Sequence, residues 1–217
     1  MIVPDGIDTD FLKRFKELVL KKVERGYSFV IICGGGKTAR NYQDAARKVH
    51  GDLSANDLDW LGIHSTRLNG HLLRTIFREV AYPTMVTNPD EVLDAPHDAR
   101  VIIAAGYRPG ASTDLRAVQI ASRTGATKLV NLSNIDYVYT DNPRKNPSAQ
   151  KVEKTSWAAF RKLIPPEWDP GLSSPFDPVA AKEAEALNLE VAIMNGAHLD
   201  EFDNYVDGRP FTGTVIS

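Results

Sequence analysis

Apolar positions along this chain follow two patterns, helical spacing and short continuous runs. Between Phe11 and Val23, apolar side chains recur every three or four residues, which predicts an amphipathic helix that begins after Asp8 or Thr9. A longer helix is predicted over residues 57–80. Its core-facing side is expected to carry Leu58, Leu61, Leu68, Leu72, Ile76 and Val80.

The continuous apolar runs predict strands at residues 29–33, 101–105, 129–132 and 191–194. A strand that is apolar on both faces is typical of a parallel sheet covered by helices on both sides. Because helical patterns separate these runs, we expect an α/β fold, a three-layer αβα sandwich with a largely parallel central sheet. Residues 1–217 are expected to form one domain, and the proline-rich segment 164–178 is expected to be a loop.

Composition narrows the classes of partner. The 26 Lys and Arg residues nearly balance the 28 Asp and Glu residues, so no basic excess favours a nucleic acid. We find no apolar stretch of membrane-spanning length and no signal peptide, which predicts a cytoplasmic protein without a membrane partner. The single cysteine, Cys33, lies within an apolar run, where a buried structural thiol is favoured over a reactive one.

The first strand runs into a glycine turn, Gly34-Gly35-Gly36, followed by a predicted helix over residues 37–49 that Gly51 ends. Glycines allow close approach of the backbone to an anion, and a helix amino end adds unpaired N–H groups and a positive dipole. This segment therefore predicts a phosphate cradle. A glycine turn without a ligand is the alternative interpretation.

Three more strand ends carry candidate chemistry. The loop 106–114 contains glycines and Ser112 or Thr113, which can cap a helix, and it suits a second anion. The polar segment 131–143 offers an aromatic ring that could pack on a base, whereas the turn 194–197 can equally be simple punctuation. Ligands of open parallel sheets lie at the carboxyl ends of strands. We therefore expect these loops to hold two phosphorylated molecules, as a phosphotransferase requires.

Together these motifs resemble the amino-acid kinase superfamily and, within it, the uridylate (UMP) kinases of archaeal type. The resemblance extends over almost the whole chain. It rests on residues 34–42, 59–69, 108–114, 133–139, 176–181 and 213–216. It implies the amino-acid kinase fold, a homohexamer, and a step of pyrimidine biosynthesis in which ATP phosphorylates UMP to UDP with Mg²⁺.

The resemblance also implies roles for individual residues. Asp114 matches the acid that orients catalytic cations in related kinases, and no metal ligand is assigned beyond it. Positions implied to bind UMP are Gly35, Asp59, Tyr107, Arg108, Pro109, Gly110, Ala111, Ser112 and Thr113. Positions implied to bind ATP are Gly36, Arg40, Ser133, Asn134, Tyr139 and Asn142.

The chain departs from the family pattern in places. Family members open with a strand and a Lys-x-Gly-Gly-Ser-type turn, and this sequence begins downstream of that turn, at Ile2-Val3-Pro4-Asp5-Gly6. We expect either a start codon placed too far downstream or a truncated kinase. Ser133, Tyr137 and Asn142 stand where the family usually has Thr, Gly and Asp.

Two alternatives to an active UMP kinase stay open. The first is a nucleotide-binding but catalytically impaired or storage-type protein of the same fold. The second is a dinucleotide-dependent oxidoreductase, because a glycine turn after a strand and an acid about twenty residues later match that fingerprint. The second is disfavoured because Asp57 and Asp59 lie in a helical pattern rather than at a strand end.

Overall fold

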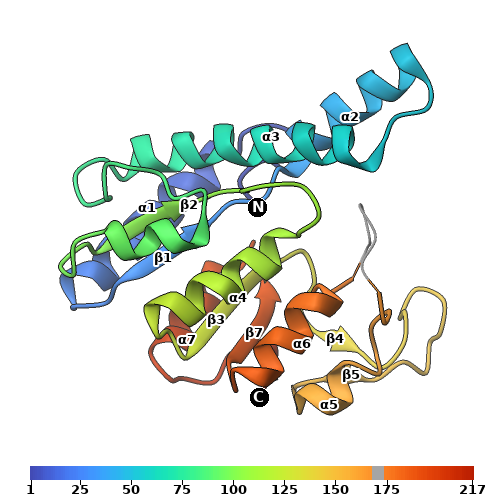
Figure 1. Ribbon diagram of the computed structural model, residues 1–217. Coiled ribbons are helices and arrows are strands. Elements are labelled where there is room, and N and C mark those ends of the chain that lie inside the picture. Colours follow the sequence, from blue (N-terminus) through green and yellow to red (C-terminus); the bar gives the residue numbers. More distant parts are fainter. Residues whose placement is uncertain (168–173) are drawn as a thin grey trace. The chain divides into compact units, whose positions relative to one another are not determined.

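A computed structural model of the protein describes residues 1–167 and 174–217. The chain divides into two compact units, residues 1–124 and residues 125–217 (Figure 1). Each unit combines helices with parallel strand pairs, so the predicted α/β class is confirmed.

The first unit contains four α-helices, a 3₁₀-helix and one pair of strands. Asp8 caps the first helix, since its carboxylate accepts a hydrogen bond from the Phe11 backbone N–H at 2.9 Å. Gly51 ends the second helix with a φ of 85°, as the sequence predicted. The elements are α1 (Thr9–Glu24), β1 (Phe29–Ile32), α2 (Gly36–His50), α3 (Ala55–Ile76), η1 (Pro89–Asp94), β2 (Val101–Ala104) and α4 (Thr113–Thr124).

Strands β1 and β2 pair in parallel, from Phe29 opposite Val101 to Ile32 opposite Ala104. The carboxyl ends of parallel neighbours meet at one edge, so the glycine turn and the loop after β2 both leave the sheet there. Strand β2 is buried along its length, whereas the four residues of β1 are only partly buried. The sequence-predicted burial of this apolar run is therefore incomplete in β1.

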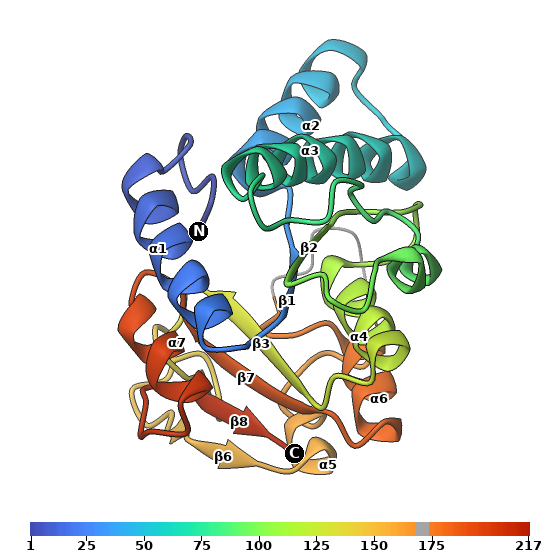
Figure 2. The same cartoon turned by 90° about the vertical axis from the view of Figure 1, so that its left-hand side faces the viewer.

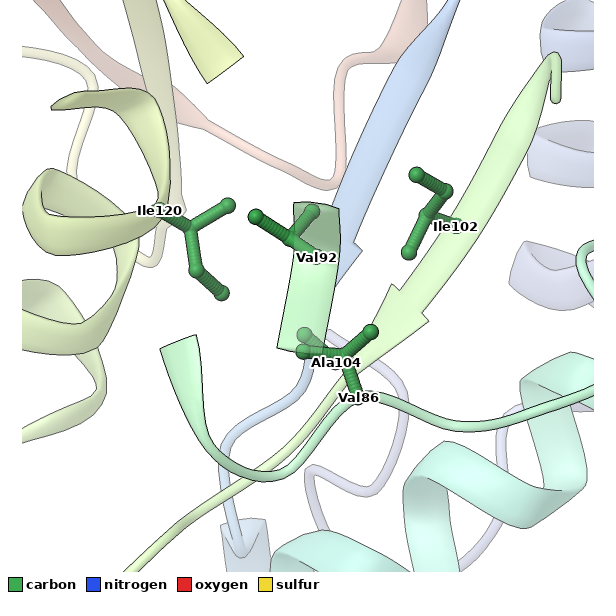
Figure 3. Packing of buried hydrophobic residues seen from close by; sticks show 5 residues of the cluster. All are labelled: Val86, Val92, Ile102, Ala104 and Ile120. Carbon is green, nitrogen blue, oxygen red and sulfur yellow. The ribbon is translucent and has the colours of Figure 1, made fainter. Parts of the chain in front are cut away.

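A buried hydrophobic cluster joins β2 to the segments on either side of it. Val86 and Val92 come from the segment around η1, Ile102 and Ala104 from β2, and Ile120 from α4 (Figure 3). Residues 102 and 104 point to the same face because side chains alternate along a strand. The cluster fixes β2 and α4 relative to each other, and thereby both ends of the loop that connects them.

Helix α3 differs from its prediction in length and in orientation. It ends at Ile76, so Val80 lies beyond it, and Leu68 is 64% exposed rather than directed toward the core. Its buried positions include Ser65, Thr66 and Asn69. Helix α3 therefore buries a partly polar face, which the apolar periodicity did not predict.

The second unit is built on a four-stranded sheet in the order β3-β7-β8-β6 (Figure 2). The pairs β3–β7 and β6–β8 are parallel and β7–β8 is antiparallel, while β4 and β5 form a separate antiparallel pair. Its elements are β3 (Lys128–Ser133), β4 (Val138–Tyr139), β5 (Lys151–Val152), β6 (Lys154–Thr155), α5 (Trp157–Phe160), α6 (Pro178–Ala186), β7 (Glu190–Asn195), α7 (Leu199–Val206) and β8 (Thr214–Ile216).

The long apolar strands of this unit were predicted and the short ones were not. Strands β3 and β7 cover the apolar runs at 129–132 and 191–194. Strand β8 has only three residues, yet it lies inside the sheet and its Thr214 and Ile216 are fully buried. Within the predicted loop 164–178, the described parts contain no helix or strand before α6, and residues 168–173 lie outside the described chain.

Candidate functional site

The glycine turn between β1 and α2 is shaped by close contacts that exclude other residues. Gly36 has a φ of 59°, and a Cβ there would lie 2.7 Å from the Val3 carbonyl oxygen. A Cβ at Gly35 would lie 2.6 Å from the Cβ of Ala39. These glycines are therefore required by the conformation of the turn.

The amino end of α2 is the predicted anion-binding end of this turn. Gly35 is its N-cap residue, and no side chain within the described ranges caps the helix. The Lys37 backbone N–H donates to the Val3 carbonyl at 2.9 Å, and the Lys37 ammonium lies 3.8 Å from the exposed Asp5 carboxylate. Arg40 is exposed one turn further along. Backbone N–H groups, the helix dipole and two cations thus concentrate positive charge at this end of α2.

The loop between β2 and α4 is the second predicted anion loop. Its Gly110 has a φ of 84°, a backbone conformation that favours glycine. The hydroxyl of Ser112 accepts a hydrogen bond from the Leu115 backbone N–H at 3.1 Å, so Ser112 rather than Thr113 supplies the cap predicted for α4. Asp114 follows in the first turn of α4, where its charge suits the helix dipole.

Asp59 is brought to this loop although 51 residues separate it from Gly110. Its Oδ2 accepts a hydrogen bond from the Gly110 backbone N–H at 2.9 Å. Asp57 and Asp59 both lie on α3, as the helical pattern predicted, so neither ends a second strand. Two separate parts of the sequence implied to bind UMP are therefore in direct contact.

Three further residues of α3 hold the same two loops, and the sequence analysis missed them. The Thr66 hydroxyl accepts from the Gly106 N–H at 2.8 Å, and the Asn69 amide donates to the Gly34 carbonyl at 2.8 Å. Arg67 donates from Nε to the Gly106 carbonyl at 3.1 Å and from Nη2 to the Tyr107 carbonyl at 2.9 Å. The sequence did offer one signal for Thr66 and Arg67. They follow Asp59 by seven and eight residues, a spacing that places them on the same side of a helix as Asp59.

The Tyr107 ring lies close to two guanidinium groups. The guanidinium Cζ of Arg108 lies 5.4 Å from the centroid of the Tyr107 ring, and that of Arg116 lies 5.5 Å from it, so both are within cation–π range. Arg116 is buried, and it donates to the Gln119 side chain at 2.8 Å. Nothing in the local sequence distinguished Arg116 from the surface cations of a helix.

In the second unit, the carboxyl ends of β3 and β7 are joined by hydrogen bonds. The Gly196 N–H donates to the Ser133 carbonyl at 2.9 Å, and the Asn195 amide donates to the Asp136 carboxylate at 2.9 Å. The turn 194–197 therefore supports the segment that carries Ser133 and Asn134.

The other predicted ATP-binding positions of this unit lie on β4 and the turn that follows. Tyr139 pairs with Lys151 across the β4–β5 ladder, and the Lys151 ammonium lies 4.9 Å from the Tyr137 ring centroid. The Asn142 side chain accepts from the Arg144 backbone N–H at 2.9 Å, an Asx-type turn. The side-chain oxygen of Asn142 is thus engaged in shaping its own turn.

The thiol of Cys33 is buried directly before the glycine turn, and burial raises its pKa to about 12. The thiol is therefore protonated at neutral pH, and the thiolate is the reactive form. We expect Cys33 to react with a thiol reagent such as dithionitrobenzoate only on unfolding, followed as thionitrobenzoate release with and without denaturant. Rapid labelling of the folded protein would contradict this.

No cluster of three or more His, Cys, Asp or Glu side chains suited to a metal ion occurs among the described residues. None of the helices in the described part of the chain is both long enough and apolar enough to cross a membrane.

Comparison with known proteins gives concordant results. Residues 5–195 match the Amino acid kinase family. The chain is 34% identical to the uridylate kinase of Hyperthermus butylicus over 95% of this chain and 90% of that protein. It is 33% identical to the uridylate kinase of Methanosarcina barkeri, over 100% of this chain and 92% of that protein. The crystal structure of uridylate kinase from Archaeoglobus fulgidus superposes with a TM-score of 0.83 at 25% identity, over 100% and 95% of the two chains.

Proposed function

We propose that this chain, which belongs to the amino acid kinase family, acts as a uridylate kinase that transfers the γ-phosphoryl group of ATP to UMP, giving UDP. The observation that carries the proposal is similarity to archaeal uridylate kinases over nearly the entire chain. The fold is that of a solved archaeal uridylate kinase.

We assign the acceptor UMP to the first unit. Asp59 and the loop 107–113 would bind the nucleoside and phosphate, and Gly35 would contact UMP from the glycine turn. The contact between Asp59 and Gly110 supports this assignment, because it brings two of the implied UMP positions together. The uncapped amino end of α2, with Lys37 and Arg40, is a suitable environment for phosphate.

Within the second unit, we assign Ser133, Asn134, Tyr139 and Asn142 to ATP binding. Within the first unit, Gly36 and Arg40 are proposed to contact the phosphates of ATP. The hydrogen bond between Gly196 and Ser133 supports the assignment of Ser133 and Asn134, because it gives these residues a defined conformation at a strand end. The ring of Tyr139 is the aromatic surface expected to lie against the base.

Phosphoryl transfer requires positioning of the two nucleotides and neutralisation of charge more than covalent chemistry. Here backbone N–H groups near Gly35 and Gly36 would orient phosphate oxygens, and the Arg40 guanidinium would offset their charge. Asp59 would orient the acceptor by accepting hydrogen bonds. The glycine turn and the Asp59 carboxylate are held in place by contacts of the turn itself and of α3.

The proposal includes Mg²⁺ as a cofactor. Mg²⁺ is usually held by one or two carboxylates together with substrate phosphates rather than by a protein cage. The carboxylate of Asp114 in the first turn of α4 is the candidate of this kind at the end of the loop that we assign to UMP. Bound there, the ion would neutralise negative charge on ATP. A homohexamer is proposed from the resemblance alone, and a cytoplasmic location stays a prediction from the sequence.

The test of the proposal is a coupled assay of the purified chain with ATP, Mg²⁺ and UMP, with UDP identified by chromatography. UDP formation is expected with UMP and far less product with AMP or GMP. Binding of ATP and UMP without UDP would favour the nucleotide-binding, catalytically impaired alternative. A protein that binds neither ATP nor UMP would contradict both the active kinase and the nucleotide-binding alternative.

Replacing Arg40 by alanine is expected to raise the dissociation constant for ATP. A charge-assisted hydrogen bond contributes about 1.5–3 kcal/mol, so the expected loss is about 10-fold to 150-fold. Isothermal calorimetry with ATP measures it. Lys48→Ala, on the last turn of the same helix, is the matched control and should leave binding unchanged. Equal ATP affinity in Arg40→Ala and the wild-type protein would refute the placement of Arg40.

A further inference from the structure

Helix α3 contacts both loops of the first unit through polar side chains along one side. Asn69 binds the glycine turn, Thr66 and Arg67 bind the start of the β2–α4 loop, and Asp59 binds Gly110 near the loop's middle. A single rigid helix therefore sets the conformation of the loop to which we assign UMP. Among these residues only Asp59 has a role implied by the resemblance.

Arg67 makes the most demanding of these contacts. Its guanidinium donates two hydrogen bonds to the consecutive carbonyls of Gly106 and Tyr107, at 3.1 and 2.9 Å, in a partly buried setting. A planar guanidinium with a fixed fork of donors can serve two carbonyls at once, whereas an ammonium group is a point donor. The contact therefore holds the orientation of two successive peptide groups.

The loop gains a second restraint at the same residue. The guanidinium groups of Arg108 and Arg116 both lie within cation–π range of the Tyr107 ring, while Arg67 holds the Tyr107 backbone. Gly106 leaves little freedom for adjustment, because a Cβ there would lie 2.9 Å from the Thr66 hydroxyl oxygen and 3.3 Å from the Ile63 Cα. The peptide between Gly106 and Tyr107 is thus restrained on several sides, and Arg67 supplies the charged restraint.

We propose that Arg67 is a positioning residue for the acceptor nucleotide, acting through the Gly106 and Tyr107 carbonyls to keep residues 107–110 in the conformation that binds UMP. The inference rests on the proposed function. Arg67 does not itself need to touch UMP. Its removal leaves the Gly106 and Tyr107 carbonyls without their donor and loosens residues 107–110, although Thr66 and Asp59 still contact the loop. The glycine turn stays held by Asn69.

The test compares Arg67→Ala, Arg67→Lys and the wild-type protein in steady-state kinetics. For Arg67→Ala, the KM for UMP should rise about 10-fold to 100-fold, as for loss of a charge-assisted contact. The KM for ATP and kcat should change by less than about 3-fold, as expected for uniform binding lost on one substrate only. Arg67→Lys should fall between the other two proteins. Arg74→Ala is the matched control, since Arg74 lies seven residues further along α3 and outside these contacts.

Two further measurements separate positioning from a general structural defect. Guanidinium ion at millimolar concentration, far below denaturing levels, should partly restore the UMP KM of Arg67→Ala, and ammonium should not. Hydrogen exchange of the Gly106 and Gly110 amides should accelerate in Arg67→Ala, while exchange in β1 stays at the wild-type rate. If Arg67→Ala does not fold, the lysine variant provides the same kinetic and exchange readouts.

Equal increases in both KM values, or unchanged amide exchange at Gly106 and Gly110, would overturn the role of Arg67. A wild-type protein that forms no UDP would instead count against the proposed function. In that case the exchange measurement still determines whether Arg67 holds the loop, so the two failures are distinguishable.

Discussion

Asp59→Ala is expected to weaken UMP binding strongly while leaving ATP binding close to wild type. Asp59 accepts a hydrogen bond from the Gly110 N–H at 2.9 Å through Oδ2, and we propose that it also binds the UMP nucleoside. Hydrogen bonds to charged groups contribute about 1.5–3 kcal/mol each. Loss of at least one such contact corresponds to an increase of about 10-fold to 150-fold in the dissociation constant for UMP.

Calorimetric titration of each nucleotide into the Asp59 variants distinguishes the two functions of this carboxylate. Asp59→Asn keeps an oxygen that can accept from Gly110 but removes the charge, so it should preserve more loop order than Asp59→Ala. Asp57→Asn is the matched control, because Asp57 lies on the same helix and bonds to the Ser54 hydroxyl instead. Equal effects of Asp59→Asn on UMP and ATP would contradict the assignment of Asp59 to the acceptor.

Gly36→Ala is expected to lower the free energy of unfolding and to abolish detectable nucleotide binding. The left-handed conformation of Gly36, with a φ of 59°, costs a residue with a Cβ about 1–2 kcal/mol. The new Cβ would also lie 2.7 Å from the Val3 carbonyl oxygen, a backbone atom, and such overpacking costs about 1–3 kcal/mol. Relief of this contact requires displacement of the turn that we propose cradles phosphate.

Urea unfolding followed by circular dichroism measures the stability change, and calorimetry with ATP measures the binding change. Gly34→Ala is the matched control two residues earlier, because a Cβ there meets nothing within 4 Å and its φ is not left-handed. Gly34→Ala should have the same urea midpoint of unfolding as the wild-type protein. A Gly36→Ala protein with wild-type stability would contradict this prediction. It would show that the Val3 backbone can move away from the new Cβ without loss of free energy of unfolding.

The short-range features of this fold were predictable because they depend on neighbours along the chain. The caps at Asp8 and Ser112 and the glycine end of α2 follow from local hydrogen bonding. The long apolar strands follow from burial on both faces, and β2 is buried throughout. Strand β8 was missed because three residues give too short a pattern, although it lies between β7 and β6 and its Thr214 and Ile216 are buried.

The orientation of α3 is the main feature that the sequence did not reveal. The apolar periodicity predicted that Leu68 faces the core. The Leu68 side chain is instead 64% exposed, and Thr66 and Asn69 are buried. Burial of these polar groups is compensated because each is hydrogen-bonded to a glycine loop. A pattern of apolar residues cannot detect a helix face whose partners are backbone groups elsewhere in the chain.

By itself, the sequence determined the types of the elements, the glycine turn with its helix, and the membership in a kinase family. These features depend on the spacing of nearby residues and on motifs in a fixed order along the chain. Only the tertiary structure decided that Asp59 contacts Gly110, that Arg67 holds Gly106 and Tyr107, and that two guanidinium groups lie close to the Tyr107 ring. The physical reason is that these contacts join residues of α3 and α4 to one loop after β2. Their existence depends on how helices pack on a strand pair rather than on the preferences of any short segment.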